Sequence, residues 1–229
     1  MSLKTSNLPF KARVDHEVHN TIMRKAVVKA QETIGANRQK MVDELGHWEE
    51  WRDLSKQIRN HVLANLDAYL YQLSEKVIEN GGKVYFAETA EEASTYIRKV
   101  ALEKNAKKIV KSKSMVTEEI GLNEVLEKEG MQVIETDLGE YLLQISGDKP
   151  SHIVVPAIHK DRHQIRKDLS EKLGYEGEET PEDMTRFVRE KIRQDFLEAD
   201  IGISGCNFAV AETGSVCLVT NEGNLRLAT

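Results

Sequence analysis

The chain has 229 residues, of which 31% are charged and 40% hydrophobic, and its formal net charge is −6. This mixture is typical of a soluble globular protein, and the acidic balance excludes a general basic surface for nucleic acid. No apolar run approaches the ~20 residues of a membrane-spanning helix, and the start of the sequence lacks the apolar core of a signal peptide, so we expect a cytoplasmic location.

Residues 1–80 are nearly neutral, and their pattern predicts an N-terminal helical region. One long helix is expected after Pro9. A second begins near Trp48 and carries apolar residues at three- and four-residue steps as far as Val77, which predicts a single apolar face. Asn80 and the two glycines after it end this helix. The apolar face either packs inside the protein or docks a partner subunit.

Residues 81–229 carry the acidic excess, and expected strands alternate there with expected helices. The expected strands are Lys83–Ala87, Lys108–Val110, Met131–Glu135, His152–Val155 and Ile201–Ile203. The expected helices are Thr89–Lys104, Asn123–Lys128, Asp161–Leu173 and Thr180–Glu198. Alternation of this kind predicts an α/β domain, with a mostly parallel sheet between two layers of helices.

The stretch after Ile203 predicts short antiparallel strands joined by tight turns. Glycines beside the turns allow the backbone to approach a ligand closely. The polar turn residues are Asn207, Glu212, Thr213, Ser215, Asn221, Glu222 and Asn224. A further strand is expected to begin as the sequence reaches Thr229. Since an unpaired half-hairpin is unfavourable, we expect a domain that is truncated at its C-terminus, part of a longer protein.

The segment Lys111–Ser114 follows the expected strand Lys108–Val110, at the sheet edge where ligands bind in parallel α/β folds. Lysine charge, serine hydroxyls and free backbone N–H groups suit a carboxylate or a phosphate. The alternative is a solvated loop in a basic stretch, and the spacing alone favours neither. Glu118, Glu119 and Asn123, a little further on, either start a charged helix or belong to the same site.

Glu135, Asp137 and Glu140 follow the next expected strand. Three carboxylates within six residues are unfavourable unless a positive charge lies near, and Lys111 and Lys113 could supply it. The group is therefore either structural or a general acid–base apparatus.

Histidine and cysteine give little sign of a metal site. His152 and His159 are seven residues apart, a spacing that matches no zinc motif. Cys206 and Cys217 are the only cysteines, which excludes an all-cysteine iron–sulfur site with its four ligands. His159, at the end of an expected strand, is either a structural histidine or a proton carrier near neutral pH.

Several spaced motifs resemble the LUD domain of lactate utilisation proteins, and the resemblance covers nearly the whole chain. These motifs are Lys111–Ser114, Glu118–Asn123, Glu135–Glu140, Ser151–Ile153, Pro156–His159, Gly205–Phe208, Glu212–Gly214 and Thr220–Asn224. The N-terminal segments Trp48–Arg52 and Asn65–Asp67 are most similar to lactate utilisation protein B, the iron–sulfur subunit type of the family.

The resemblance implies a fold similar to the CoA-transferase and ribose-5-phosphate isomerase group. It implies a role, with two partner subunits, in oxidising L-lactate to pyruvate, which allows growth on lactate. A small organic acid is the expected ligand. The favoured ligand-binding residues are Lys111, Lys113, Ser114, Glu118, Asn123, Asp137, Glu140, Asn207, Thr213, Asn221, Glu222 and Asn224. The candidates for a catalytic role are His159, Glu135 and Glu212.

Two features depart from the family pattern. Family members of this type continue into cysteine-rich motifs for two [4Fe-4S] clusters, and those cysteines are not present here, so we expect no cofactor in this chain. Leu225 stands where the family usually has glycine. Two other functions stay open: a module that senses an organic acid or nucleotide, and an assembly scaffold. The chain could also form a homo-oligomer.

Overall fold

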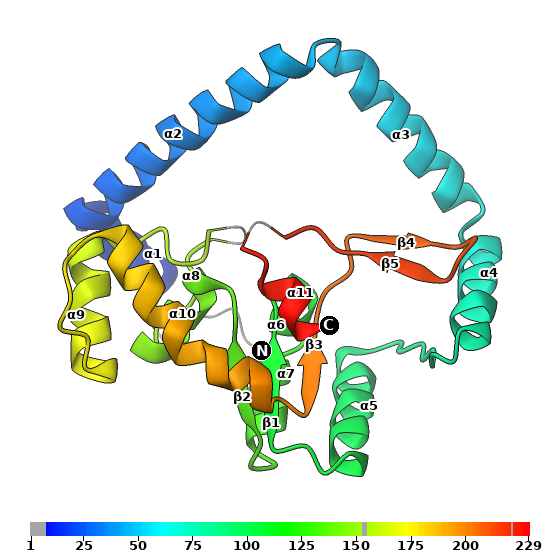
Figure 1. Ribbon diagram of the computed structural model, residues 1–229. Coiled ribbons are helices and arrows are strands. Elements are labelled where there is room, and N and C mark those ends of the chain that lie inside the picture. The colour runs from blue at the N-terminus through cyan, green and yellow to red at the C-terminus, as the bar shows by residue number, and fades with distance from the viewer. Residues whose placement is uncertain (1–7, 153–154, 221) are drawn as a thin grey trace. The chain divides into compact units, whose positions relative to one another are not determined.

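The computed structural model describes residues 8–152, 155–220 and 222–229, and Figure 1 labels their helices and strands. The chain divides into two compact units. The sheet unit comprises Met1–Val27, Ala87–Gly205 and Val219–Thr229, and the hairpin unit comprises Val28–Phe86 and Cys206–Leu218. Each unit combines segments from distant parts of the sequence. A domain boundary at residue 80 therefore stays a prediction.

The elements of the sheet unit alternate between helices and strands. They are α1 (Phe10–His19), α5 (Ala90–Glu103), β1 (Lys108–Lys111), α6 (Met115–Glu119), α7 (Leu122–Glu127), β2 (Gln132–Glu135), α8 (Leu138–Ser146), α9 (Arg162–Leu173), α10 (Pro181–Glu198), β3 (Ile201–Ile203) and α11 (Asn224–Ala228). The hairpin unit holds α3 (Trp48–Ala64), α4 (Leu66–Glu79), β4 (Phe208–Val210) and β5 (Ser215–Cys217). Helix α2 (Thr21–Leu45) crosses from one unit into the other.

Three short parallel strands form the sheet, in the order β2–β1–β3. Because β1 is central, its last residue, Lys111, lies between Glu135 of β2 and Ile203 of β3. The parallel sheet and mixed α/β character that the alternation predicts are thereby confirmed, as is an antiparallel hairpin, formed by β4 and β5.

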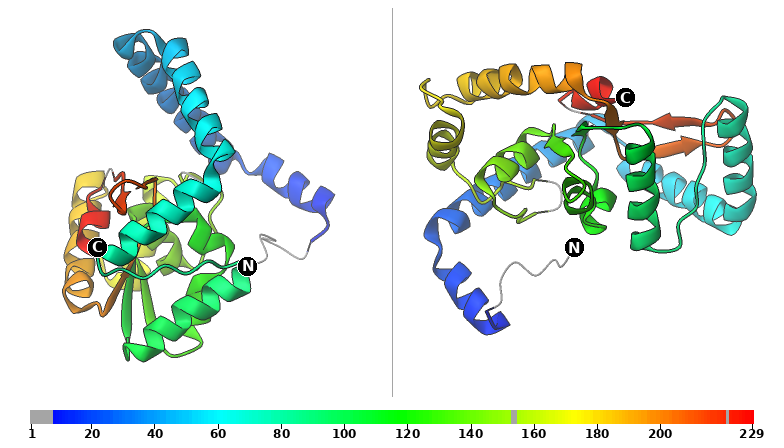
Figure 2. Two further views of the ribbon diagram at one scale, coloured as in Figure 1. Left: turned by 90° about the vertical axis from the view of Figure 1, so that its right-hand side faces the viewer. Right: turned by 90° about the horizontal axis from the view of Figure 1, so that it is seen from below.

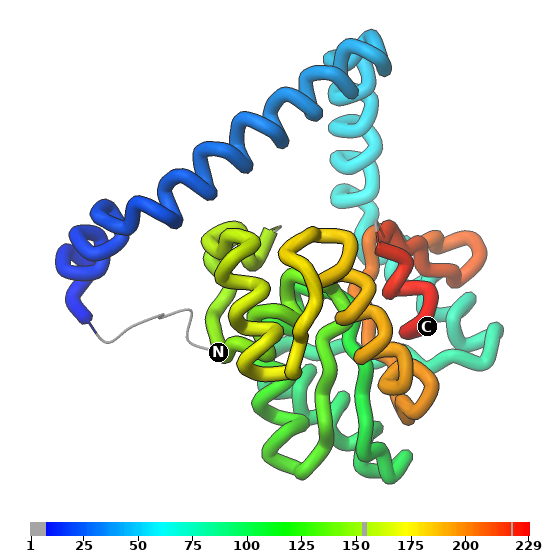
Figure 3. The backbone as a smooth tube through the Cα atoms, turned by 60° about the vertical axis from the view of Figure 1, so that its left-hand side comes forward, coloured from blue at the N-terminus to red at the C-terminus, as the bar shows by residue number. Residues whose placement is uncertain are grey.

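Helices cover both faces of the sheet (Figures 2 and 3). On one face, Ala101 of α5 and Leu126 of α7 pack in a cluster with Ile109 of β1 and Val133 of β2. On the other face, α8 contacts β2 and α10 contacts β1, and these helices pack with α9 around the fully buried Leu169. None of the helices in the described residues is long and apolar enough to cross a membrane.

Side-chain caps start three helices where the sequence predicts them. Thr89 accepts a hydrogen bond from the backbone N–H three residues later, at the start of α5, and Thr180 does the same for α10. Asp161 forms a complete capping box with Gln164 at the start of α9. These local bonds satisfy N–H groups that have no partner inside the helix, which explains why local sequence predicts them well.

Two predicted strands differ from the structure. Lys83–Ala87 forms no strand, and its apolar residues Val84 and Phe86 are exposed, since a short apolar run by itself does not provide a pairing partner. The predicted strand His152–Val155 falls partly on residues 153 and 154, which lie outside the described residues. Its two described ends are not in a strand.

The expected strand near Thr229 is also wrong, because Asn224–Ala228 is the short helix α11. Gly223 has a φ of +79° and precedes the helix, and Leu225 and Ala228, three residues apart, bury the same side of it. The sequence does not predict helix α8, and it gives a helix start near Glu118, where the structure has α6 and α7, only as one of two alternatives.

The N-terminal helices are interrupted more often than the sequence predicts. The expected long helix after Pro9 breaks at Asn20, and the helix from Trp48 breaks at Asn65, whose side-chain amide donates to the His61 carbonyl. The apolar face of α3 was expected to pack or to dock a partner, and Trp51 on it is exposed.

The hairpin unit brings together residues that are far apart in the sequence. The Asn80 side-chain amide, at the end of α4, donates to the Thr213 carbonyl in the turn of the hairpin at 2.9 Å. Gly214, with φ +70°, lies so close to α4 that a Cβ there would be 2.6 Å from the Lys76 carbonyl carbon. Glycine is therefore required where this turn meets the helix.

Gly202 of β3 provides a test of how α11 packs on the sheet. A Cβ at this position would lie 1.6 Å from the Ala228 carbonyl oxygen of α11. We expect Gly202→Ala to displace α11 and lower the free energy of unfolding by about 1–3 kcal/mol, measured by urea unfolding.

Gly35→Ala is the matched control, because no described atom lies within 4 Å of that Cβ inside α2. This control should raise the free energy of unfolding by up to ~1 kcal/mol, since glycine is unfavourable in a helix interior. Equal effects of the two substitutions would show that α11 does not pack on Gly202 as described.

Candidate functional site

The candidate site lies at the carboxyl ends of β1 and β2. The parallel register places Lys111 directly beside Glu135, so both side chains leave the same face of the sheet. This edge is where ligands bind in open α/β sheets. The backbone pairing alone therefore positions one ammonium and one carboxylate side by side.

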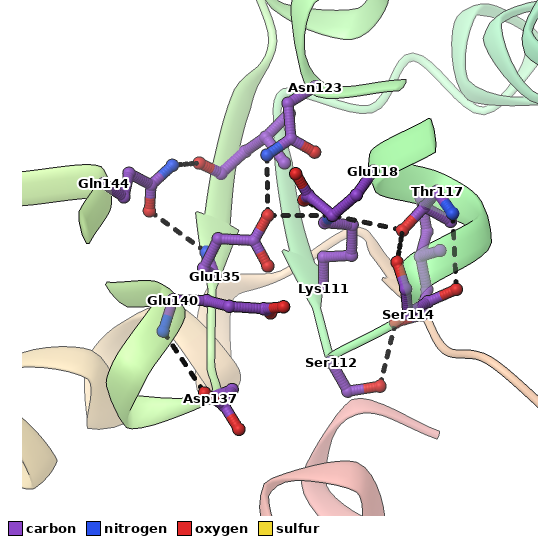
Figure 4. Close-up of polar contacts among 12 residues, drawn as sticks. Lys111, Ser112, Ser114, Thr117, Glu118, Asn123, Glu135, Asp137, Glu140 and Gln144 are labelled. Carbon is purple, nitrogen blue, oxygen red and sulfur yellow. Dashed lines mark hydrogen bonds and ion pairs between the residues drawn. The ribbon is translucent and has the colours of Figure 1, made fainter. Parts of the chain in front are cut away.

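Lys111 is completely buried and makes three polar contacts (Figure 4). Its Nζ lies 2.8 Å from Oε1 of Glu118 and 2.8 Å from Oε1 of Glu135, and it donates to Thr117 Oγ1 at 3.2 Å. An ammonium has three N–H donors, so these contacts use all of them. Removing one partner from such a pair would leave a buried charge uncompensated, which is strongly unfavourable.

Helix α6 is positioned to face Lys111 by a cap at Ser114. The Ser114 side chain accepts from the Thr117 backbone N–H at 3.4 Å, and the Thr117 hydroxyl donates to the Ser114 carbonyl at 2.8 Å. The first turn is thereby fixed, and Thr117 and Glu118 both reach the ammonium.

Glu135 is held from two further elements. Asn123 of α7 donates its side-chain amide to Glu135 Oε1 at 2.6 Å. Gln144 of α8 accepts from the Glu135 backbone N–H at 3.1 Å and donates to the Val133 carbonyl at 2.8 Å. The Gln144 side chain thus hydrogen-bonds backbone groups on the free edge of β2, as a neighbouring strand would. These bonds hold α8 beside the site.

Three acceptor atoms of the site are buried without a hydrogen-bond partner among the described residues. They are Oε2 of Glu135, Oε2 of Glu140 and Oδ1 of Asn123. Glu135 is 3% exposed and Glu140 8% exposed. Figure 4 shows the Glu140 carboxyl beside that of Glu135. Unpaired buried carboxylate oxygens are unfavourable, so this position is suited to a bound proton or to a ligand that donates hydrogen bonds.

The residues that carry these atoms line a pocket of about 350 Å³, which we call the acidic pocket. Its lining residues are Met115, Glu118, Asn123, Glu124, Glu127, Glu135, Glu140, Leu143, Gln144, Gly147, Asp148, Lys149, Pro150, His152 and Pro156. Acidic side chains predominate. Within the described residues, no group of three or more His, Cys, Asp or Glu side chains is arranged to hold a metal ion.

Burial and neighbouring carboxylates raise the pKa of Glu140 to about 8, since Glu135 and Asp137 both disfavour a further negative charge. Burial also raises the pKa of Glu135, although the Lys111 charge opposes that shift. For Lys111, burial lowers the pKa, but the two carboxylates outweigh it and the net shift is upward. At neutral pH the site therefore holds a charged lysine and a Glu140 that is largely protonated, which could act as a general acid.

Three other predicted residues lie near this edge in the sheet unit. Asp137 caps α8 by accepting from the Glu140 backbone N–H. Glu222 accepts from the Leu138 backbone N–H at 3.0 Å, and Asn224 donates to the Thr136 hydroxyl at 3.2 Å. The C-terminal segment therefore lies against the start of α8.

Lys111 has a different environment from the one expected for an anion site. Its charge is already matched by two carboxylates, so it offers no excess positive charge to an organic acid. Lys113 is partly buried, and its charge lowers the pKa of Glu222, whose net shift is upward because burial outweighs it. Ligand binding by these lysines stays a prediction.

His159 and the predicted hairpin residues are not among the residues that line the acidic pocket. His159 Nδ1 lies 2.7 Å from the Ser151 hydroxyl. Asn207, Glu212 and Thr213 belong to the hairpin unit, where the Thr213 hydroxyl donates to Ser215. Asn221 lies outside the described residues.

Thr117 and Gln144 are site residues that the sequence reasoning missed. Gln144 lies on α8, one helical turn after Glu140, and the spacing of Asp137 and Glu140 is that of a helix cap followed by an acidic third residue. That pattern could have identified α8 and hence Gln144. Thr117 carries no comparable signal, because its role depends on the burial of Lys111.

Comparison with protein families gives one match, to the family described as LUD domain, over residues 70–229. This range includes both strands of the site and all of the acidic pocket. No solved structure matches the chain.

Curated relatives resemble the chain along its whole length. It is 72% identical over 229 residues to "Uncharacterized electron transport protein YkgF" of Escherichia coli (strain K12). The matched region is 100% of this chain and 48% of that protein. It is 59% identical to "Lactate utilization protein B" of Bacillus cytotoxicus and 58% identical to that of Bacillus cereus (strain B4264), each over 227 residues, 99% of this chain and 48% of the relative. The chain spans about half the length of these relatives.

Replacing Lys111 tests the buried ion pairs. Lys111→Met keeps the length of the side chain but leaves Glu118 and Glu135 without their cation. We expect the free energy of unfolding at pH 7 to fall by about 3–5 kcal/mol in urea unfolding. The loss should shrink at acid pH, because protonation of Glu135 removes an unpaired charge.

Lys104→Met is the control, because Lys104 is exposed, and it should change the free energy of unfolding by less than ~0.5 kcal/mol. A loss in Lys104→Met as large as that in Lys111→Met would refute the assigned ion pairs of Lys111.

Glu140 gives the site a pH dependence with a definite sign. Its pKa is about 8 in the folded protein against 4.5 for an unperturbed carboxyl, so the folded state binds the proton more tightly. The free energy of unfolding therefore falls as the pH rises from about 4.5 to about 8. In Glu140→Gln the side chain cannot titrate, so the free energy of unfolding should fall less steeply over this pH range, as measured by urea unfolding. Glu176→Gln, on an exposed loop, should leave the slope unchanged; equal slopes for Glu140→Gln and wild type would contradict the shift.

Proposed function

The chain belongs to the LUD domain family, and we propose that it is the LUD part of a protein that acts in lactate utilisation, in the oxidation of L-lactate to pyruvate. The observation that carries this proposal is the 58–59% identity to proteins named lactate utilization protein B, which extends over 99% of the chain. Similarity of this extent supports a shared role. The proposed location is the cytoplasm.

The electron-transfer step is proposed for the longer protein. The name of the Escherichia coli relative refers to electron transport, and this chain spans 48% of that protein. Cys206 and Cys217, both exposed free thiols, do not fit a [4Fe-4S] cluster, which normally takes four cysteine ligands. We therefore place two such clusters in the part of the protein outside this chain, and we propose two further lactate-utilisation subunits as its partners.

The fold proposal is a three-layer sheet of the CoA-transferase and ribose-5-phosphate isomerase type. Support comes from the parallel strands with helices on both faces and from the polar residues gathered at their carboxyl ends. In such folds the sheet edge holds the ligand.

Within this role, the chain's own residues hold and move a proton. The Lys111 ammonium lies 2.8 Å from both Glu118 and Glu135, and Glu140 beside them, with a pKa of about 8, keeps its proton near neutral pH. A group of this kind can donate a proton to a bound molecule and take it back. His159 and Glu212 stay candidates for catalytic roles.

A second candidate function is a ligand-binding module without chemistry of its own. The acidic pocket and its unpaired acceptor atoms favour it, since these features require only that a ligand binds.

Growth on lactate tests the leading proposal. In a host with its other lactate-oxidising enzymes removed, we expect deletion of the gene for the full-length protein to abolish growth on L-lactate and to leave growth on glucose unchanged. The intact gene should restore growth, and a gene carrying Lys111→Met should restore it less well than one carrying Lys104→Met. Undiminished growth of the deletion strain on L-lactate would refute the role.

A further inference from the structure

The acidic pocket contains two buried oxygens whose hydrogen-bonding capacity is unused. Oε2 of Glu135 and Oε2 of Glu140 have no partner among the residues that the structure describes, and both side chains are more than nine-tenths buried and line the pocket. Asn123 adds a third unpaired acceptor, its amide oxygen. When Glu140 is ionised, all three atoms are acceptors without a donor among the described residues, and a ligand with donor groups would satisfy them.

The charges around these oxygens exclude an anion as the preferred occupant. Six of the lining side chains are carboxyl groups: Glu118, Glu124, Glu127, Glu135, Glu140 and Asp148. Two lysines with buried side chains contact this set and are both matched: Lys111 pairs with Glu118 and Glu135, and Lys160 pairs with Asp148 and Asp168. Lys149 lines the pocket but is exposed, so solvent screens it. A carboxylate or phosphate placed here would meet like charge.

We propose that the acidic pocket binds an organic ligand through a hydrogen-bond-donating head group, a hydroxyl or a primary ammonium, seated against Oε2 of Glu135 and Oε2 of Glu140. The ligand class is therefore a polyol or an amine. This goes beyond the lactate role, because the pocket chemistry does not depend on it. A metal ion is the less suitable occupant, since no three ligand-type side chains in the described residues are arranged to hold one.

The protonation of Glu140 distinguishes the two kinds of head group. The groups that act on its charge are Glu135 on β2, Asp137 at the start of α8, Glu118 on α6 and Lys111 on β1. Because the pKa of Glu140 is about 8, the group is mostly neutral at pH 6.5 and mostly charged at pH 8.5. An ammonium binds best to the charged form, so its affinity should rise with pH. A hydroxyl can donate to either form, so its affinity should change little.

Three probes of one size test the proposal by calorimetry or ligand-observed NMR. They are 1-amino-2-propanol, propane-1,2-diol and L-lactate, which share a methyl group and a secondary hydroxyl and differ in one head group. We expect either the amine or the diol to bind at least ~10-fold more tightly than L-lactate at pH 8.5. If the amine is preferred, its affinity should rise roughly 10-fold or more between pH 6.5 and 8.5. A preferred diol should show no such rise.

Glu140→Gln is the test variant, because it keeps the shape of the protonated side chain and cannot acquire charge. It should remove the pH dependence of amine binding and weaken amine binding at pH 8.5 by ~10-fold, whereas binding of the diol should change little, because the amide oxygen still accepts a hydrogen bond. Glu176→Gln removes the same charge on an exposed loop and should match wild type. L-Lactate as the tightest probe, no detectable binding of amine or diol, or amine binding that still rises with pH in Glu140→Gln would overturn the proposal. None of these outcomes bears on growth on lactate, so the two proposals fail separately.

Discussion

The ion pairs of Lys111 determine how this part of the protein is arranged. Its ammonium lies at the end of the central strand and joins β2 through Glu135 and α6 through Glu118. Since Asn123 binds the same Glu135 oxygen, α7 is included as well. Four elements therefore meet at one buried charge, and each depends on the others to keep that charge compensated. Such a site is rigid, because movement of any one element exposes an unpaired ion.

The same arrangement explains why Glu140 behaves unlike its neighbours. One lysine compensates two carboxylates, so a third carboxyl group placed beside them finds no further cation. Glu140 lies in the first turn of α8, where the helix dipole favours negative charge, yet burial and the neighbouring carboxylates outweigh that effect and raise its pKa. Glu140 is thus set apart from Glu135, whose raised pKa is opposed by the Lys111 charge, and environments that separate the pKa values of neighbouring acids are the usual way to divide proton-holding roles.

The sequence predicts the elements that depend on local chemistry. The capped starts of α5, α9 and α10 and the three parallel strands follow from spacing and composition alone. Burial is harder to predict from sequence: Lys111 and Lys113 look alike in a basic stretch, but Lys111 is fully buried between two carboxylates and Lys113 is only partly buried. The carboxylates after β2 are predicted as either structural or an acid–base group, and the structure shows that Asp137 and Glu140 also start helix α8. The lactate family was recognised because its motifs are spaced along most of the chain.

The joining of α4 to the β4–β5 hairpin has a consequence for biosynthesis. The two segments of the hairpin unit end and begin at residues 86 and 206, so the ribosome adds roughly 120 residues between them. Because translation proceeds at ~5–20 residues per second, about 6–24 s pass between the synthesis of α4 and that of the turn that contacts it. During that time Asn80 has no Thr213 carbonyl to bind, and the exposed apolar face of α3 is in the nascent chain. Chaperones that bind nascent apolar segments would act here, before the sheet unit is complete.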